Sequence, residues 1–414
     1  MASMTQIPLR AATSSLCVAL IFGFAGGAKA TPRCEGKLPR IEIADRQNTT
    51  LSLLKEKKYA ELQRRMDAFL TSYTDGRISD EELFYEFGAF DRWGPFLEPL
   101  IQEWITRYPK SFAAVHALSL HATAVAWQLR GDSLARETSD QQFRDFDKRL
   151  RVARDLSMRS LELHPKPILA YQQLMASAKG LKFDLRIEVP PVRTSTFLQE
   201  PPLASPRPDV LPILRESLRI QPDNTIVRET YVTLLAPKWG GNLDSLVAYS
   251  KASAHPGLQP DRLAAVSYAA TMEIASDYRF RKKLDEAVPI LEIASRICRL
   301  NQPFVDIANV RLGQDRFEEA LKAANDAMSL VPDSSTGSLL KAKALRGLSR
   351  HHEAVVLLQR LAPEGMPEVL YLLGEYYATG EGGLSLDTAQ ARRLLGLAAR
   401  AGDERATKRL QTLN

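Results

Sequence analysis

The feature that most constrains this chain is a spacing of 34 residues between matching small residues in its C-terminal half. A period of this length is typical of pairs of antiparallel helices. One pair cannot bury its apolar face alone, so successive pairs stack into an elongated solenoid. The sequence therefore predicts an all-α helical-repeat fold. The matching positions are Ala308 and Ala342, Gly313 and Gly347, and Ala320 and Ala354.

A second spacing supports the same fold. Ala320 is followed seven residues later by Ala327 and five residues after that by Pro332. Small residues are expected where two helices cross closely, and proline ends the second helix. Earlier segments repeat this order, which extends the helical pattern towards the N-terminus. They are Ala153, Ser160 and Pro165; Val210, Ser217 and Pro222; and, without the proline, Ala287 and Ala294.

This pattern resembles the tetratricopeptide repeat. The resemblance implies that the first helix of each pair lines a concave groove, and that the protein binds other chains rather than catalysing a reaction. Counting from Ala320 and Ala354 gives a candidate partner-binding groove, whose cations would suit an acidic or carboxylate-ended peptide. The alternative is ordinary solvated charge, because Val305, Thr336 and Leu339 occupy other positions of the family's carboxylate clamp. The groove residues are Arg279, Asn309, Lys343 and Arg346.

The last forty-odd residues carry a different repeat. A first helix is predicted over 367–377, and Gly380 and Gly383 flank a loop that ends at Asp387. A second helix rich in Ala and Leu ends near Gly402. This order closely resembles a Sel1-like repeat, a relative of the tetratricopeptide repeat with a longer loop between its helices. Residues 404–412 are predicted to form a capping helix, because a terminal repeat needs a polar outer face.

The N-terminal half resembles a bacterial domain family of unknown function over residues 51 to about 250. The resemblance rests on the segments 126–131 and 237–241, with Phe143 and Phe146 between them. It implies a helical fold and a bacterial origin, and it implies no activity. The same segments hold Trp127, Arg130, Lys238 and Trp239, which form a second candidate site. Tryptophan often anchors an interface, but the alternative is that both tryptophans simply pack helices together.

Residues 1–30 are predicted to be a secretory signal peptide. Arg10 precedes a short apolar run over 16–24, and Ala28-Lys29-Ala30 fits the small-residue pattern of a cleavage site after Ala30. A membrane anchor would need about 20 apolar residues. The protein is therefore expected to be periplasmic or secreted, with no membrane span after cleavage.

The charge of the chain is only mildly basic. Lys and Arg number 55 against 49 Asp and Glu, and cleavage would remove Arg10 and Lys29, which changes the net charge from +6 to +4. No block of five or six like charges occurs, and no basic stripe is interleaved with aromatic residues. Nucleic acid is therefore not expected as a partner, whereas a protein or peptide of unknown identity is.

Two cysteines remain after cleavage, Cys34 and Cys298. An oxidising compartment permits a disulfide between them. The alternative is that Cys298 packs as a small apolar residue, because it follows Ile290, Leu291 and Ala294 at helical spacing. Sequence alone does not choose between these alternatives.

No catalytic or metal-binding motif is present. His352-Glu353 lacks the second histidine of a zinc-protease helix, because Val356 occupies that position. The cysteines are too far apart for a Cys-x-x-Cys site, and no phosphate-binding loop or nucleophile elbow occurs. We expect no catalytic residues, metal or cofactor.

The sequence thus predicts an exported, non-catalytic binding protein that serves as an envelope scaffold or neutralises a partner. The alternative is a cell-wall-associated enzyme, or an accessory to one, that uses the region of Trp127 and Trp239. The predicted parts are a signal peptide (1–30), a leader (31–50), a helical N-terminal domain (51–182), a Pro-rich loop (183–210), helical repeats (211–300), tetratricopeptide-like pairs (301–366) and a Sel1-like repeat with its cap (367–414).

Overall fold

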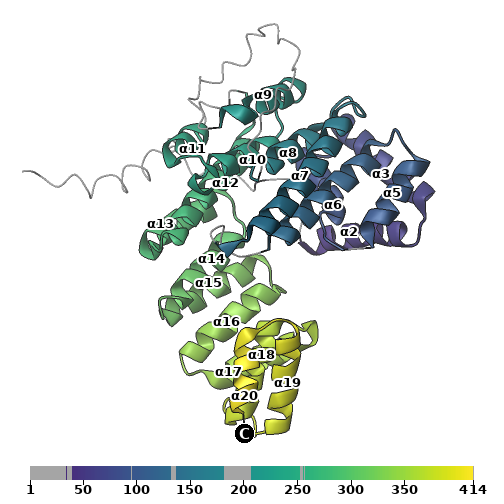
Figure 1. Ribbon diagram of the computed structural model, residues 1–414. Coiled ribbons are helices and arrows are strands. Elements are labelled where there is room, and N and C mark those ends of the chain that lie inside the picture. The colour runs from purple at the N-terminus through teal and green to yellow at the C-terminus, as the bar shows by residue number, and fades with distance from the viewer. Residues whose placement is uncertain are drawn as a thin grey trace, which may run out of the picture. The chain divides into compact units, whose positions relative to one another are not determined.

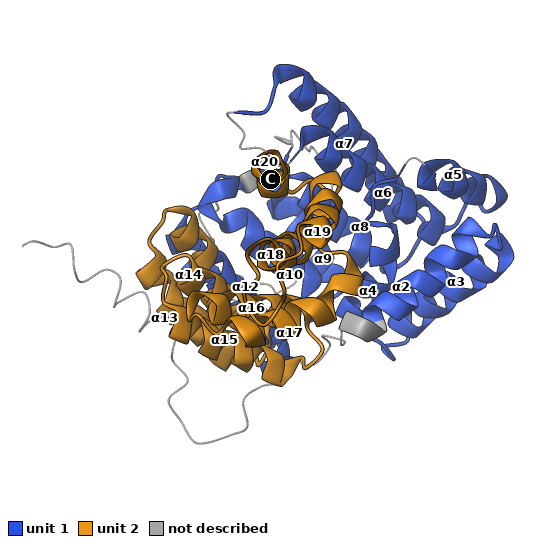
Figure 2. Cartoon of the chain, turned by 90° about the horizontal axis from the view of Figure 1, so that it is seen from below, with its two compact units in different colours: residues 1–273 blue, residues 274–414 orange. Residues whose placement is uncertain are grey.

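The computed structural model describes residues 34, 40–94, 96–131, 137–180, 207–251, 255 and 257–413. Over these residues the regular elements are helices, with no strand among them. The predicted all-α class is therefore confirmed. The chain divides into two compact units, unit 1 over residues 1–273 and unit 2 over residues 274–414 (Figure 2). The predicted signal peptide and most of the Pro-rich loop lie outside the described residues.

Unit 1 is a series of helices in which neighbours along the chain pack against one another, as α6 does on α7 and α7 on α8 (Figure 1). Short 3₁₀ turns, η1 (Gly88–Phe90) and η4 (Pro237–Trp239), join some of them. The helices are α2 (Arg40–Lys55), α3 (Tyr59–Thr74), α4 (Asp80–Phe87), α5 (Leu97–Arg107), α6 (Phe112–Arg130), α7 (Asp140–Leu161), α8 (Ile168–Ser177), α9 (Leu211–Ile220), α10 (Ile226–Leu235), α11 (Leu243–Tyr249) and most of α12 (Pro260–Phe280).

The first of these helices starts earlier than the sequence predicts. The segment up to residue 50 is expected to be a loose leader, yet α2 begins at Arg40. The buried apolar residues of α2 that mark it as a helix in the sequence, Leu51 and Leu54, lie in its last turns. Its first turns have no such apolar stripe. Polar contacts hold the earlier part instead: the Gln47 side-chain amide donates a 2.7 Å hydrogen bond to the Tyr85 carbonyl.

Capping serines set the starts of three helices of unit 1, α4, α6 and α7. The Ser79 hydroxyl accepts a hydrogen bond from the Glu82 backbone N–H at 3.1 Å, and the Glu82 carboxylate accepts one from the Ser79 N–H at 3.0 Å. This capping box satisfies two N–H groups that would otherwise lack partners at the start of α4. Ser139 forms a second capping box with Gln142 at the start of α7, and the Ser111 hydroxyl accepts from the Ala114 N–H at the start of α6.

Unit 1 also buries carboxylates that join helices far apart in the sequence. Asp80 is fully buried and accepts hydrogen bonds from the Thr225 and Ile226 backbone N–H groups at 2.6 and 3.0 Å. The Arg262 guanidinium donates to its second oxygen at 2.9 Å. Because a buried charge is costly unless it is paired, this arrangement fixes α4 against α10 and α12.

Unit 2 consists of antiparallel pairs, beginning with the end of α12, which crosses the boundary between the units, and α13 (Leu284–Ile297). From α13 onward each helix contacts the next, and α14 also contacts α16, the first helix of the following pair. The remaining helices are α14 (Gln302–Leu312), α15 (Phe317–Leu330), α16 (Ser335–Gly347), α17 (His351–Leu361), α18 (Pro367–Thr379), α19 (Thr388–Arg400) and α20 (Glu404–Thr412).

The turn inside the pairs α12–α13, α14–α15 and α16–α17 repeats in atomic detail. Lys282, Asp315 and Ser349 all have positive φ, from 55° to 61°, and each lies two residues before its second helix. The residue that follows donates its N–H to the carbonyl five residues back, as from Arg350 to Leu345 at 2.9 Å. This is the Schellman ending of a helix. Lys57, between α2 and α3 of unit 1, has the same conformation and the same hydrogen bonds.

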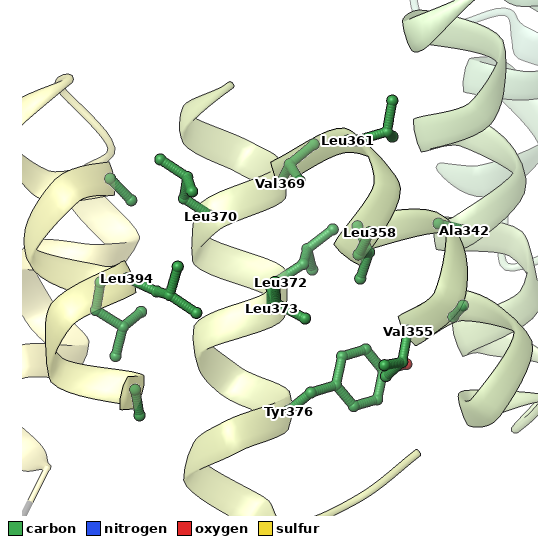
Figure 3. Packing of buried hydrophobic residues seen from close by; sticks show 14 of the residues in the cluster. Ala342, Val355, Leu358, Leu361, Val369, Leu370, Leu372, Leu373, Tyr376 and Leu394 are labelled. Carbon is green, nitrogen blue, oxygen red and sulfur yellow. The ribbon is translucent and has the colours of Figure 1, made fainter. Parts of the chain in front are cut away.

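The alanines of the repeat are buried, as the sequence predicts, whereas Gly313 and Gly347 are exposed at the ends of their helices. The Cβ of an alanine at Gly347 would come within 2.3 Å of the Phe317 ring, so glycine allows these helices to approach each other. In the last pairs, α18 presents apolar side chains to both of its neighbours, towards Leu394 of α19 and towards Val355 and Leu358 of α17 (Figure 3). The buried repeat positions are Ala153, Ala287, Ala294, Ala308, Ala320, Ala327, Ala342 and Ala354.

Candidate functional site

The predicted groove residues of unit 2 lie along the first helices of successive pairs, here called the first-helix row: the end of α12, α14, α16 and α18. Arg279 of α12 forms an ion pair with Asp306 of α14 at 2.7 Å. Lys343 of α16 forms another with Glu368 of α18 at 2.9 Å. These two cations therefore link neighbouring first helices, and their charges are neutralised by the protein itself.

Arg346 and Asn309 differ from this pair. Both residues are exposed. The Arg346 guanidinium lies 5.8 Å from the centroid of the Tyr376 ring, and no carboxylate among the described residues lies within the 4.0 Å of an ion pair. The Asn309 amide donates to the Val305 carbonyl of its own helix at 3.0 Å, which leaves its oxygen free to accept. Of the four groove residues, these two retain capacity to bind a partner.

The row is thus less cationic than the sequence suggests. Arg279 and Lys343 are predicted as ligand contacts from their repeat positions, but their acidic partners lie on the first helix of the next pair. Counting positions within one repeat does not reveal a partner that lies in the next repeat. The arrangement can still offer the Arg346 guanidinium and the Asn309 amide to a bound chain, whereas the Tyr376 ring is buried in the core.

In unit 1, the structure brings together the second set of predicted residues. The Trp127 and Trp239 rings meet edge to face with centroids 6.0 Å apart. The Arg130 guanidinium lies 5.7 Å from the Trp127 ring centroid, and the Lys238 ammonium forms a 2.8 Å ion pair with Glu273. Both tryptophans are only partly buried, so this cluster remains open to solvent.

Three residues of this cluster were not predicted as site residues. Phe146 of α7 packs on Trp127 with ring centroids 4.8 Å apart. Glu273 of α12 pairs with Lys238, and Lys179, just after α8, lies 6.0 Å from the Trp239 ring centroid. Burial lowers the pKa of Lys179. Neither Lys179 nor Glu273 belongs to a motif, so only their position in the folded chain reveals them.

Cys34 and Cys298 are both disulfide-bonded and buried. That Cys34 and Cys298 are joined to each other stays a prediction, which peptide mapping without reductant tests directly.

Unit 1 also contains two cavities that the sequence does not indicate. One, of about 440 Å³, lies between the α3–α4 and α9–α10 turns and is lined by Lys166, Arg262 and Asp223, among others. The other, of about 740 Å³, is lined by residues that include Asp67 and His164. Both mix positive and negative side chains, so charge does not select one class of ligand for them.

No group of His, Cys, Asp or Glu side chains in the described part of the chain has the arrangement of a metal site. No helix among those residues is both long enough and apolar enough to cross a membrane.

Part of unit 1 matches a known protein family. Residues 46–184 match the family model described as a domain of unknown function (DUF4034). The expected N-terminal domain of unknown function is therefore confirmed over this range. No curated protein matches the sequence.

Solved structures give more distant matches. They include YrrB, described as a TPR protein with an unusual peptide-binding site, at 16% identity over 48% of this chain and 97% of that one, with a TM-score of 0.34. Human IFIT1 with m7Gppp-AAAA matches at 14% identity over 92% and 87%, with a TM-score of 0.39. Yeast Tom70 matches at 11% identity over 89% and 93%, with a TM-score of 0.32. At these scores the tetratricopeptide-like assignment rests on the helix pairs and turns of this chain itself.

Proposed function

We propose that this chain is an exported, non-catalytic protein that binds a protein or peptide partner through the first-helix row of unit 2. It would act as an envelope scaffold or as the neutralising partner of another protein. Export rests on the sequence of residues 1–30, and the oxidised cysteines support it. The binding role rests on the helical-repeat architecture, whose stacked pairs present one row of helices to a partner.

The observation that carries this proposal is the state of Arg346. Its guanidinium is exposed, lies beside the Tyr376 ring and has no acidic partner among the described residues. By contrast, Arg279 in the same first-helix row is paired with Asp306. A guanidinium offers several N–H donors in a fixed plane and binds carboxylates strongly. An acidic side chain or C-terminus of the partner is the expected counterpart.

Affinity capture from the cell envelope tests the proposal, with the tagged chain, its Arg346→Glu variant and a control compared side by side. Arg346→Glu should remove a stoichiometric partner, because it replaces the unpaired cation with a like charge. Arg360→Glu is the control for the change of charge: Arg360 lies on α17, the second helix of the same pair, and its ion pair with Asp333 is in solvent, with the two side chains 65% and 75% exposed. This variant should retain the partner.

The structure makes this a sharper experiment than a double substitution that includes Lys343. Lys343→Glu would place a second carboxylate beside Glu368, so a loss of binding could come from a disturbed α16–α18 contact. Partner recovery that is equal for Arg346→Glu and the unchanged chain would remove the first-helix row as the binding surface. Equal loss in both arginine variants would show a general charge effect instead.

A further inference from the structure

The Trp127–Trp239 cluster of unit 1 contains an indole N–H with no acceptor. The Trp239 Nε1 atom is buried, and no hydrogen-bond partner for it is found in the part of the chain that the structure describes. Tryptophan nitrogen is a donor only, and such groups usually have a partner when they are buried. A buried donor left without an acceptor costs free energy, so it calls for a specific explanation.

A second donor lies beside it. The Lys179 ammonium is 6.0 Å from the Trp239 ring centroid, and no carboxylate of the described residues lies within 4.0 Å of it. Glu273 and Asp91 favour its charged form from further away, whereas Lys238 opposes it. Glu273 is already paired with Lys238 at 2.8 Å. Lys179 is therefore the one ammonium of this cluster that the protein does not neutralise by contact.

Arg207 holds these two donors in place. Its guanidinium donates to the Trp239 carbonyl and to the Ala178 carbonyl, both at 2.9 Å. Ala178 directly precedes Lys179, so one side chain fixes the backbone beside both donors. Asp209 neutralises the charge of Arg207 through a 2.8 Å ion pair. We therefore assign the guanidinium to holding the backbone and not to binding a ligand. The geometry is set before any ligand arrives, and such preorganisation lowers the cost of binding.

We propose that Lys179 and Trp239 together bind the carboxylate of a small organic acid, and that the Trp127 and Trp239 rings contact the aromatic or apolar part of the same molecule. A carboxylate accepts from an N–H and an ammonium at once and carries the single negative charge that one unpaired cation matches. The edge-to-face tryptophans, with Phe146 behind Trp127, supply an apolar wall. This site is separate from the first-helix row and is proposed independently of it.

Fluorine NMR of the full chain labelled with 5-fluorotryptophan tests this proposal. The chain has four tryptophans, and Trp93 and Trp104 serve as internal references because they lie outside the cluster. Sodium benzoate is the probe, and benzamide, which has the same ring and no charge, is its matched control. Benzoate should shift the Trp239 and Trp127 resonances saturably, and benzamide should bind at least tenfold more weakly.

Two variants separate the donors. Lys179→Met keeps the length of the side chain and removes its charge, and Trp239→Phe keeps a ring and removes the N–H. Each should weaken benzoate binding about tenfold, the size expected when one charge-assisted hydrogen bond is lost. Binding to Trp239→Phe is followed at Trp127. Lys166→Met, at another partly buried lysine of unit 1, should leave affinity within about twofold.

Several results would overturn the proposal. Equal shifts from benzoate and benzamide would make the ring, not the carboxylate, the recognised group. Benzoate binding that survives both Lys179→Met and Trp239→Phe, with reference resonances unchanged, would place the acid elsewhere. No saturable shift with benzoate would rule the site out, and tenfold tighter binding of N-acetylphenylalanine than of benzoate would assign it to a peptide C-terminus rather than a small acid.

Discussion

Units 1 and 2 bury polar groups to very different extents. Unit 1 encloses Asp80, Glu86, His116 and His255, each with 2% exposure or less, whereas the buried charged residues described in unit 2, Asp277 and Arg311, retain 8% and 9%. Unit 2 repeats one pattern of small residues, so the close packing at these residues determines how its helices align. Unit 1 lacks that regularity along most of its length, and hydrogen bonds to buried charges specify which helices meet.

Asp80→Ala provides the strongest test of this difference. The substitution would leave the Arg262 guanidinium and two backbone N–H groups without their acceptor. We expect unfolding free energy to fall by about 3–5 kcal/mol, the usual cost of breaking a buried charge pair. Urea denaturation measures the change, and hydrogen exchange should place it at α4 and α10. Asp223→Ala, at an acid that is 56% exposed, should cost about 0.5 kcal/mol or less.

Leu358→Ala is the corresponding test in unit 2. Leu358 is 1% exposed and packs in the core cluster around α18 (Figure 3). Removing its side chain should lower stability by about 3 kcal/mol, because a cavity adds to the lost burial. Hydrogen exchange would rise in α16 to α18. Val356→Ala on the same helix, at a residue 53% exposed, is the control, and an equal loss from both variants would show that burial at Leu358 is not what matters.

The buried histidines predict a pH effect specific to unit 1. Burial lowers the pKa of His116 to about 3 and that of His255 to about 4. The unfolded chain binds these protons near pH 6.5, so the stability present above pH 6.5 is lost as pH falls towards 4 and 3.

His116→Leu should make the unfolding free energy less dependent on pH. Between pH 7 and pH 4.5 the variant should lose less unfolding free energy than the parent, by on the order of 2 kcal/mol. Unfolding free energies of the variant and the parent at both values measure it. His352→Leu, at an exposed histidine of unit 2, is the control. A parent and a His116→Leu variant with parallel pH profiles would contradict the assignment.

The smallest expected effect concerns the turns that the units share. Ser349→Gly should raise stability by about 0.5 kcal/mol, because glycine adopts positive φ without steric cost but loses more backbone entropy on folding. Ser335→Gly, in the first turn of α16, should instead lower it by up to about 1 kcal/mol. Thermal denaturation distinguishes the two signs. Destabilisation by Ser349→Gly would mean that the serine side chain contributes more than its backbone strain.

The helices of unit 2 could be predicted because periodicity reports burial directly. Ala320 and Ala354 are buried where the pattern places them, and α18 to α20 occupy the expected segments. The start of α2 could not be predicted, since polar contacts such as that from Gln47 to Tyr85 hold it. A hydrogen bond between residues 38 positions apart leaves no periodic trace in the sequence.

The candidate sites show the same limit. Trp127 and Trp239 could be singled out by residue type, but 112 residues separate them and only folding brings their rings together. The partners of Arg279 and Lys343 lie on the next first helix, so the predicted positive groove is mostly neutral. No sequence motif points to Lys179, because its lack of an acidic partner depends on which residues surround it in the folded chain.

The recurring left-handed turn has a consequence for how this chain tolerates changes in length. Lys282, Asp315 and Ser349 lie 33 and 34 residues apart and make equivalent hydrogen bonds. A whole pair inserted between α15 and α16 would bring its own copy of this turn and leave the turns of the existing pairs intact, whereas an insertion of a few residues would misalign every later crossing. The C-terminal half is therefore a scaffold that can be lengthened or shortened in units of one pair, and its binding surface can be enlarged without redesigning its core.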